Sequence, residues 1–261
     1  MATACITGAS SGIGLEIARI LGSYGYDLVL IARDSAKLQR IAKQITKKCH
    51  NQIRCSVIPC DLASQEACQK LAQRLRELPI TILVNNAGFG ELNTFTDGSL
   101  EHQMDMINVN IKAVHILTHE LLPHMIKQDH GYILNVASSA GLMPGSPYMS
   151  VYYATKSYIT SLTAAISREL SIAGSHVHVS MLCPGPVNTG FNEAAGVSHA
   201  LPGISARRCA SYAVKKMFQG KVTIVPTLTM QAAVTFTRFL PRSLAVAIAG
   251  HQQKKKMQGS K

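Results

Sequence analysis

Short apolar runs alternate with longer amphipathic segments along most of the chain. The apolar runs are nearly continuous in Val, Ile and Leu, which is typical of strands buried on both faces of a parallel sheet. Strand followed by helix, in repetition, predicts a doubly wound α/β fold. We expect about seven strands, at residues 3–7, 27–32, 53–58, 80–85, 131–137, 176–182 and 222–225. We expect helices on both faces of the sheet, at residues 12–24, 34–48, 64–78, 100–128, 150–173 and 205–219.

One domain is expected, because the pattern contains no linker and no short-period repeat. A chain of 261 residues is a normal length for a single sheet covered on both faces. We assign residues 1–250 to this domain and residues 251–261 to a basic C-terminal tail. The first strand begins almost at the first residue, so no signal peptide is expected.

The composition, 47% hydrophobic and 15% charged, is that of a globular protein with a large core. The seven cysteines form no C-x-x-C pair and are odd in number, which favours reduced thiols in a cytoplasmic protein. His115 and His119 have the i, i+4 spacing of metal ligands on a helix, but nothing near them supports a metal site. We therefore interpret them as helix-surface or packing residues and expect no metal.

The net charge of +12 is concentrated near the C-terminus. After Glu193 there are eleven Lys or Arg residues and no Asp or Glu, so this part could face phosphate, acidic lipid or an acidic protein. No nucleic-acid motif accompanies it, and we expect no nucleic-acid partner. The uncharged run of 16 residues at 222–237 is shorter than the ~20 needed to span a bilayer. Two interpretations stay open: helices packed over a cleft with a frayed tail, or peripheral contact with a membrane surface.

The first strand is followed by a turn rich in glycine and serine, TGASSGIG at residues 7–14, which opens a helix. Glycines let the chain turn sharply and bring backbone N–H groups close to a phosphate at the helix N-terminus. A tight strand-to-helix turn needs glycine for packing in any case. Its place after the first strand of an α/β chain favours nucleotide binding.

The end of the second strand indicates which nucleotide. A carboxylate there would bind the adenosine ribose of NAD, but Arg33 can instead pair with a 2′-phosphate and favours NADP. Asp34 is interpreted as the N-cap of the helix at 34–48. Asp61, after the third strand, is placed to meet the adenine edge or to cap the next helix.

Six motifs occur in an order and spacing that resemble the short-chain dehydrogenases/reductases. They are TGASSGIG (7–14), NNAG (85–88), NVN (108–110), SSAG (138–141), YYATK (152–156) and PGPVNTG (184–190). The resemblance covers about residues 2–190 and is strongest to the steroid and 3-ketoacyl reductase branch. It implies a Rossmann-type fold, a nicotinamide dinucleotide and a homo-dimer or homo-tetramer.

The resemblance also implies a catalytic group of Asn, Ser, Tyr and Lys. The Y-x-x-x-K pattern fits only Tyr152 and Lys156, which share one helix face, while Tyr153 is one residue too late. A nearby ammonium and a positively charged nicotinamide are expected to lower the tyrosine pKa from about 10. Counting back from Gly141 selects Ser138, and the usual separation from the tyrosine selects Ser139; we choose Ser138. Asn110 corresponds to the family residue that holds a water in the proton relay.

The residues expected to bind the cofactor are spread over the ends of several strands. They are Gly8, Ser10, Ser11, Gly12, Ile13, Gly14, Arg33, Asp61, Leu62, Asn86, Ala87, Gly88, Tyr152, Lys156, Pro184, Gly185, Val187 and Thr189. A segment at about 186–204 should close over the substrate, and its apolar residues Phe191, Val197 and Leu201 favour a hydrophobic one.

These features predict an NADP(H)-dependent oxidoreductase that interconverts a ketone and a secondary alcohol. The expected substrate is steroid-like, acyl-like or an aromatic ketone. Two other classes stay open: a non-catalytic dinucleotide-binding regulatory module, and an epimerase or dehydratase of the same fold. The complete Ser, Tyr and Lys set favours the reductase, because a regulatory module has no need for a lysine four residues after a tyrosine.

Overall fold

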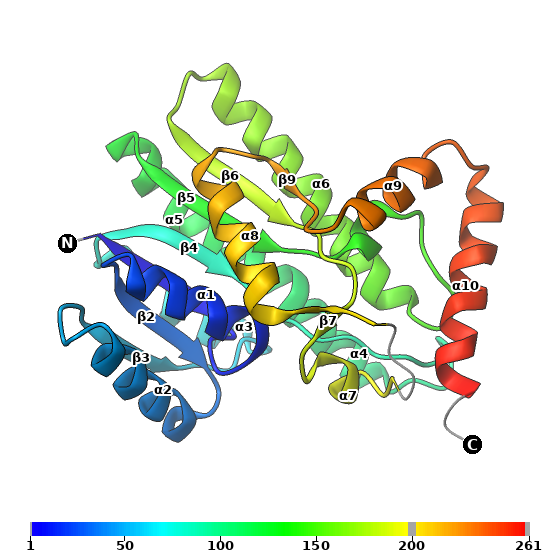
Figure 1. The fold of residues 1–261 in the computed structure, drawn as a ribbon, viewed down its shortest axis with the longest axis horizontal. Helices are drawn as coiled ribbons and strands as arrows, with labels where there is room; N and C mark the ends of the chain where they lie inside the picture. Colours follow the sequence, from blue (N-terminus) through cyan, green and yellow to red (C-terminus); the bar gives the residue numbers. More distant parts are fainter. Residues whose placement is uncertain (1, 198–201, 259–261) are drawn as a thin grey trace.

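Seven parallel strands form the centre of the molecule, in the order β3-β2-β1-β4-β5-β6-β9 (Figure 1). The computed structural model describes residues 2–197 and 202–258. The strands of this sheet are β1 (Thr3–Thr7), β2 (Asp27–Ala32), β3 (Cys55–Pro59), β4 (Ile80–Asn85), β5 (Gly131–Val136), β6 (Val177–Leu182) and β9 (Thr223–Ile224). The predicted Rossmann-type sheet is confirmed, and its strand order reverses between β1 and β4.

Helices cover both faces of the sheet, as the pattern predicted. One face is covered by α1 (Gly12–Ser23), α2 (Ser35–Lys48) and α8 (Ala206–Phe218). The other is covered by α3 (Gln65–Arg76), α5 (Val114–Gln128) and α6 (Ser150–Ile172). The buried side chains on the two faces form separate apolar clusters, and the strands supply both of them because they alternate their side chains between the faces.

The helix expected at 100–128 is one continuous helical run, but its centre is not α-helical. It consists of α4 (Leu100–Ile107), the π-helical segment η1 (Asn108–Ala113) and α5. A π turn inserts an extra residue, which rotates the side chains that follow it. Asn110 lies in this segment and is fully buried.

The helices α1, α2 and α3 differ in whether a side chain caps their first turn. The Asp34 carboxylate accepts a hydrogen bond from the Lys37 backbone N–H at 2.8 Å, which confirms it as the N-cap of α2. Ser64 caps α3 in the same way. The Ser11 side chain, in contrast, caps no N–H of α1, so the first turn of that helix keeps its donors free.

The smaller elements follow the ends of β5 and β6, and the last two helices follow β9 in the sequence. They are η2 (Ser139–Leu142), β7 (Val187–Asn188), α7 (Phe191–Ala194), β8 (Ile204–Ser205), α9 (Leu228–Thr237) and α10 (Arg242–Gln258). The frayed tail expected from residue 251 is wrong for residues 251–258, because α10 continues through Gln258. The buried Ala249 and Gln253 hold this part of the helix on the body of the protein. Within the described residues, no helix combines the length and the apolar character needed to cross a membrane.

Candidate active site

The carboxyl ends of β1, β4, β5 and β6 bring most of the predicted site residues to one edge of the sheet. The TGASSGIG turn follows β1, NNAG begins at the end of β4, Ser138 follows β5 and PGPVNTG follows β6. Ligands of open parallel sheets bind at this edge, where the strand order reverses. The edge therefore holds both the nucleotide candidates and the catalytic candidates.

Close approach of the backbone explains the glycines of the first turn. Gly8 and Gly12 have φ angles of +63° and +56°, a region that favours glycine. A Cβ on Gly14 would stand 2.3 Å from the Asn86 side-chain nitrogen and 2.6 Å from the Gly8 carbonyl oxygen. The turn thus leaves no room for a side chain at residue 14.

Asn86 holds the glycine turn rather than projecting away from it. Its side-chain amide donates hydrogen bonds to the carbonyl oxygens of Thr7 and Gly8, at 3.0 and 3.2 Å. The Thr7 hydroxyl in turn accepts from the backbone N–H groups of Asn86 and Ala87. The end of β4 therefore fixes the shape of the turn after β1.

The first turn of α1 fits a phosphate group. Its N–H groups receive no cap from the exposed Ser11, and the helix N-terminus carries partial positive charge. Thr189 lies over Gly12, since its methyl group would be 3.3 Å from a Cβ placed there. Ser10 and Ile13 are half-buried beside the same turn. The chain thus presents free donors, a tight turn and a covering loop, the arrangement that a dinucleotide pyrophosphate requires.

The loop after β6 is held from two sides. The Pro184 carbonyl accepts a hydrogen bond from the Ser139 N–H at 2.9 Å, and Val187 is buried in a short pairing with Ile204. A Cβ on Gly185 would meet the Met230 methyl at 2.6 Å. The loop is therefore wedged between η2 and α9. Residues 198–201 of the expected substrate segment, Leu201 among them, lie outside the described residues.

The predicted residues at the adenosine end are less enclosed. Arg33 is exposed at the end of β2. The Asp61 carboxylate accepts a hydrogen bond from the Ala63 N–H at 3.0 Å, and Leu62 is buried. Asp61 therefore shapes the loop before α3, while Ser64 caps that helix.

Tyr152, Lys156 and Ser138 converge beside β5. Tyr152 and Lys156 lie one turn apart on α6, and both are buried. The Lys156 ammonium is 5.9 Å from the centre of the Tyr152 ring and donates to the Val136 carbonyl oxygen at 2.9 Å. The Ser138 side chain lies near the Tyr152 phenol and favours a lower pKa for it. The Ser138 oxygen accepts a hydrogen bond from the Ala140 N–H at 3.1 Å, which leaves the hydroxyl able to donate its own proton.

Burial governs the protonation of this pair. Burial raises the pKa of Tyr152 to about 12, although the nearby Ser138 side chain favours a lower value. It lowers the pKa of Lys156 to about 8. In the chain alone, loss of hydration therefore determines the direction of the Tyr152 pKa shift, and the lowering expected beside an oxidised nicotinamide stays a prediction.

The two candidate serines have different surroundings. Ser138 has an extended backbone two residues after β5, and its side chain lies near Tyr152, whereas Ser139 starts the 3-10 turn and donates its N–H to the Pro184 carbonyl oxygen. These surroundings favour Ser138 over Ser139, and the assignment of the catalytic serine stays a prediction.

Asn110 lies beside Lys156, next to Gly88. Its amide donates to the Phe89 carbonyl oxygen at 2.9 Å and to the Thr155 hydroxyl at 3.1 Å, and its oxygen accepts from the Phe89 N–H. A Cβ on Gly88 would be 2.9 Å from the Asn110 oxygen and 3.3 Å from the Lys156 nitrogen. Asn110, Gly88 and Lys156 therefore meet at one point.

Two residues that the sequence did not mark as catalytic enclose Tyr152. The Phe191 ring lies 5.5 Å from the Tyr152 ring, and a Cβ on Gly90 would be 3.0 Å from each of these rings. A small space of about 10 Å³ remains beside Tyr152, lined by Glu91, Met149 and others. A glycine between two aromatic rings gives no periodic signal, so only the folded chain reveals this contact.

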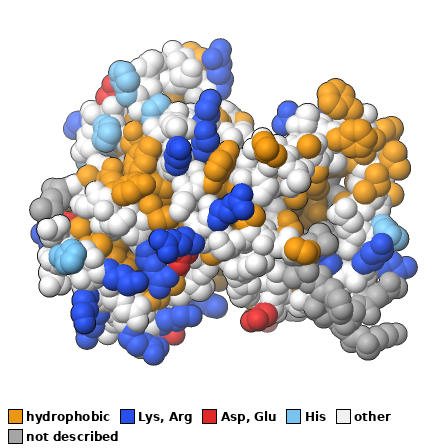
Figure 2. Space-filling model, viewed as in Figure 1, with side chains coloured by type: hydrophobic (Ala, Val, Ile, Leu, Met, Phe, Trp, Pro, Cys, Tyr) orange, Lys and Arg blue, Asp and Glu red, His pale blue; other side chains and the backbone are white. Residues whose placement is uncertain are grey.

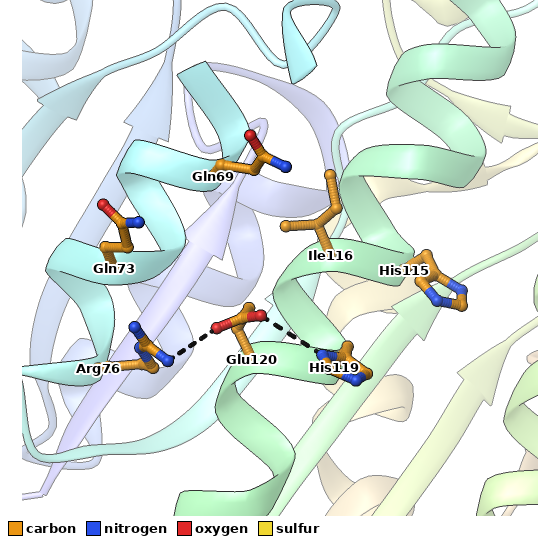
Figure 3. Close-up of a pocket in the computed structure, with 7 residues that line it drawn as sticks. All are labelled: Gln69, Gln73, Arg76, His115, Ile116, His119 and Glu120. Atoms are coloured by element: carbon orange, nitrogen blue, oxygen red, sulfur yellow. Dashed lines mark hydrogen bonds and ion pairs between the residues drawn. The ribbon is translucent and has the colours of Figure 1, made fainter. Parts of the chain in front are cut away.

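A larger hollow of about 540 Å³ lies elsewhere, between α3 and α5 (Figure 3). Gln69, Gln73 and Arg76 line it from α3, and Arg76 pairs with Glu120 of α5 at 3.0 Å. His119 also contacts Glu120, while His115 hydrogen-bonds Tyr158 at 2.7 Å. None of the predicted catalytic residues reaches this hollow, so we place the active site by its chemical groups and not by the size of the cavity.

The fold and the site define a dinucleotide-binding α/β protein with a Ser, Tyr and Lys group at the carboxyl edge of its sheet. The chain belongs to the short chain dehydrogenase family, whose pattern matches residues 2–198. It is therefore an oxidoreductase of that family, which uses a nicotinamide dinucleotide and acts on small molecules.

Known proteins agree with this assignment. The ketoacyl reductase HetN of a Nostoc species is 34% identical over 85% of this chain and 77% of its own length. A short-chain dehydrogenase from Sphingobium yanoikuyae, solved with NADPH, is 28% identical over 91% of this chain and 93% of its own, with a TM-score of 0.83. A family member from Burkholderia phymatum, solved with NAD, is 27% identical over 89% and 91% of the two chains, with a TM-score of 0.79. Relatives of this fold thus bind either dinucleotide.

Proposed function

We propose that the protein is an NADP(H)-dependent reductase that interconverts a hydrophobic ketone and its secondary alcohol. The observation that carries the proposal is the convergence of three groups: Tyr152 and Lys156 are buried one helical turn apart, and Ser138 lies near the Tyr152 phenol. An acid can protonate the oxygen of a carbonyl group, a hydrogen-bond donor can orient that oxygen, and a nearby cation can stabilise the charge that develops. A non-catalytic module would not need this set.

In the proposed reaction Tyr152 gives its proton to the substrate oxygen during reduction and takes it back during oxidation. Burial raises the pKa of Tyr152 to about 12, so the phenol is protonated at neutral pH. It therefore has a proton to donate when the ketone is reduced. Ser138 orients the substrate oxygen by hydrogen bonding. Lys156 and Asn110, next to each other at Gly88, hold the hydroxyl and water groups of the proton path. The nicotinamide, when bound, supplies or accepts the hydride.

The choice of NADP over NAD is supported by Arg33. Its exposed guanidinium ends β2, while the neighbouring Asp34 carboxylate is used in capping α2. A 2′-phosphate would gain a charge-assisted hydrogen bond from Arg33. The NADPH complex of the Sphingobium relative is consistent with this choice.

A hydrophobic substrate is supported by the apolar residues around Tyr152. Leu92, Met106 and Met149 are buried there, and Phe191 and Val197 pack on the same cluster. The space of about 10 Å³ beside Tyr152 is too small for a ketone, so Phe191 must move for the substrate to enter. The name of the Nostoc relative supports an acyl ketone among the candidates.

The test is reduction of a ketone panel with NADPH that carries deuterium at the transferring position. Steroids, 3-ketoacyl thioesters and aromatic ketones are the substrates to compare, and mass spectrometry should find one deuterium on the alcohol carbon. Ser138→Ala should lower kcat by roughly 10²-fold or more, the scale of one lost transition-state donor. Ser139→Ala is the matched control and should keep kcat. No deuterated alcohol from any ketone, or equal losses in both serine variants, would contradict the proposal.

A further inference from the structure

Exposed apolar side chains gather on the two C-terminal helices and the turn between them. Figure 2 shows hydrophobic atoms massed over the end of the molecule that α9 and α10 form in Figure 1. Five large side chains in this region are exposed, and we call them the C-terminal apolar surface. They are Leu228 (80%), Phe236 (63%), Phe239 (80%), Leu244 (48%) and Ile248 (46%).

The side chains of this surface differ from those with which α9 and α10 pack on the core. On α9 the core side is formed by the buried Val234, with Met230 packed on a neighbouring cluster. Leu228 and Phe236, eight residues apart, lie on one exposed stripe. On α10 the core side is Ala245, Ala249 and Gln253. Both helices are therefore anchored on one face and apolar on the face that points outward.

Positive charge borders the C-terminal apolar surface. Arg238 and Arg242 flank the turn beside Phe239, and Lys254 and Lys255 are exposed further along α10. Figure 2 shows blue and pale blue side chains continuing from the hydrophobic cluster along that end of the molecule. The sequence after Glu193 contains no acidic residue, and none of these four side chains forms an ion pair within the described residues.

We propose that this surface binds the face of an anionic lipid bilayer. Phenylalanine, leucine and isoleucine can enter the boundary between headgroups and acyl chains, while arginine and lysine contact the lipid phosphates. A second copy of the chain fits the surface less well. A symmetric pairing would bring two copies of the same basic border close together, and like-charge contacts are destabilising.

The same two helices close the substrate side of the proposed active site. The Gln253 amide of α10 donates to the Tyr153 hydroxyl at 3.1 Å, next to Tyr152. Met230 of α9 lies against Gly185 of the loop after β6. A protein seated on lipid through these helices would take a lipophilic ketone from the bilayer. This last step rests on the proposed function, whereas membrane binding itself does not.

The first test is sedimentation of the full chain with vesicles of phosphatidylglycerol and phosphatidylcholine, or of phosphatidylcholine alone. We expect binding to the anionic vesicles at low salt and its loss at high salt, because the ions screen the lipid charge. Phe236→Ser/Phe239→Ser should weaken binding by roughly tenfold or more, since two large apolar side chains no longer enter the lipid. Ile172→Ser, at another exposed apolar residue, is the control and should bind like the wild type.

A charge-matched pair separates this surface from general attraction of a basic protein. Arg238→Gln/Lys255→Gln should lower the partition coefficient by about 30-fold, which follows from ~1 kcal/mol for each basic residue at an anionic surface. Lys47→Gln/Lys48→Gln removes the same charge from the end of α2 and should change binding by less than about threefold. Equal losses in both double variants would overturn the proposal.

Insertion can be measured directly because the chain contains no tryptophan. Phe239→Trp gives a single emitter in the turn, and anionic vesicles should shift its emission to the blue and allow quenching by brominated lipids. Ile172→Trp should show neither change. An unshifted and unquenched Trp at residue 239 would overturn insertion. A wild-type dimer in sedimentation velocity that Phe236→Ser/Phe239→Ser converts to a monomer, without loss of vesicle binding, would assign the surface to a second copy instead.

Discussion

Replacing Arg33 by alanine tests the proposed cofactor preference. Arg33 is exposed at the end of β2 and, within residues 2–197 and 202–258, forms no ion pair. Its removal should therefore leave the fold unchanged. A charge-assisted hydrogen bond contributes about 1.5–3 kcal/mol, so the Kd of NADPH should rise by about 10- to 150-fold. NADH has no 2′-phosphate, and its Kd should stay within about twofold because the lost donor has no partner on it.

The assay is isothermal titration of both dinucleotides into wild type, Arg33→Ala and Arg40→Ala. Arg40 is also exposed, one turn into α2, and its removal changes the net charge equally. Only Arg33→Ala should lose its preference for NADPH. A wild type that binds both dinucleotides equally, or an equal weakening of NADH and NADPH in Arg33→Ala, would refute the reasoning.

Three further results are expected. Burial lowers the pKa of Lys156 from its ordinary 10.5 to about 8. Between these two pH values the unfolded chain binds more protons at this residue than the folded chain, so the free energy of unfolding rises with pH. In urea denaturation, the free energy of unfolding of the wild type should rise by roughly 3 kcal/mol relative to that of Lys156→Met over this pH window. A difference between the two proteins that does not change with pH would contradict this. Asn110→Ala leaves both Phe89 backbone groups without their partner and should cost about 2 kcal/mol of unfolding free energy, against no change if the contacts are incidental. Gly14→Ala brings a Cβ within 2.3 Å of Asn86 and should weaken NADPH binding by roughly tenfold or more in the same titration, whereas an unchanged Kd would show that the turn is not the phosphate site.

The sheet and its helices could be predicted because continuous apolar runs and 3.6-residue periodicity are local signals. The strands at 3–7, 27–32 and 80–85 have the predicted bounds, and the others differ by a residue or two at their ends. The π-helical segment at Asn108–Ala113 could not be predicted, since one inserted residue barely disturbs the periodicity of a long helix. Its effect on the site is large, because it carries the buried Asn110.

The site divides along the same line. The four-residue spacing of Tyr152 and Lys156 is a local signal, and it predicted that both side chains lie on one face of a helix. The structure places both on the buried face of α6. The bond of Tyr153 to Gln253 joins residues 100 positions apart, and no local pattern reports such a contact. Burial, which depends on the whole fold, raises the pKa of Tyr152 in the chain alone and could not be predicted from the sequence, whereas the lowering expected beside a bound oxidised nicotinamide stays a prediction.

The same long-range packing explains the C-terminal end. Lys254, Lys255 and Lys256 look like a frayed tail in the sequence, since a run of like charges disfavours a helix. In the structure Ala249 and Gln253 bury the opposite side of α10, and Met257 packs near the Tyr152 cluster. Tertiary contacts on one face therefore keep the lysine run helical.

The most direct measurement of the central claim compares Tyr152→Phe with Tyr153→Phe in single-turnover reduction of a ketone by NADPH. Both variants lose one phenol hydroxyl from adjacent residues of α6, but the Tyr152 phenol lies near Ser138, while the Tyr153 hydroxyl accepts a hydrogen bond from Gln253. Tyr152→Phe should bind NADPH normally and lose the hydride-transfer rate by roughly 10²-fold or more. Tyr153→Phe should keep that rate and lose only about 1 kcal/mol of stability. A fast Tyr152→Phe, or a Tyr153→Phe that alone is inactive, would contradict the assignment of Tyr152 as the catalytic acid.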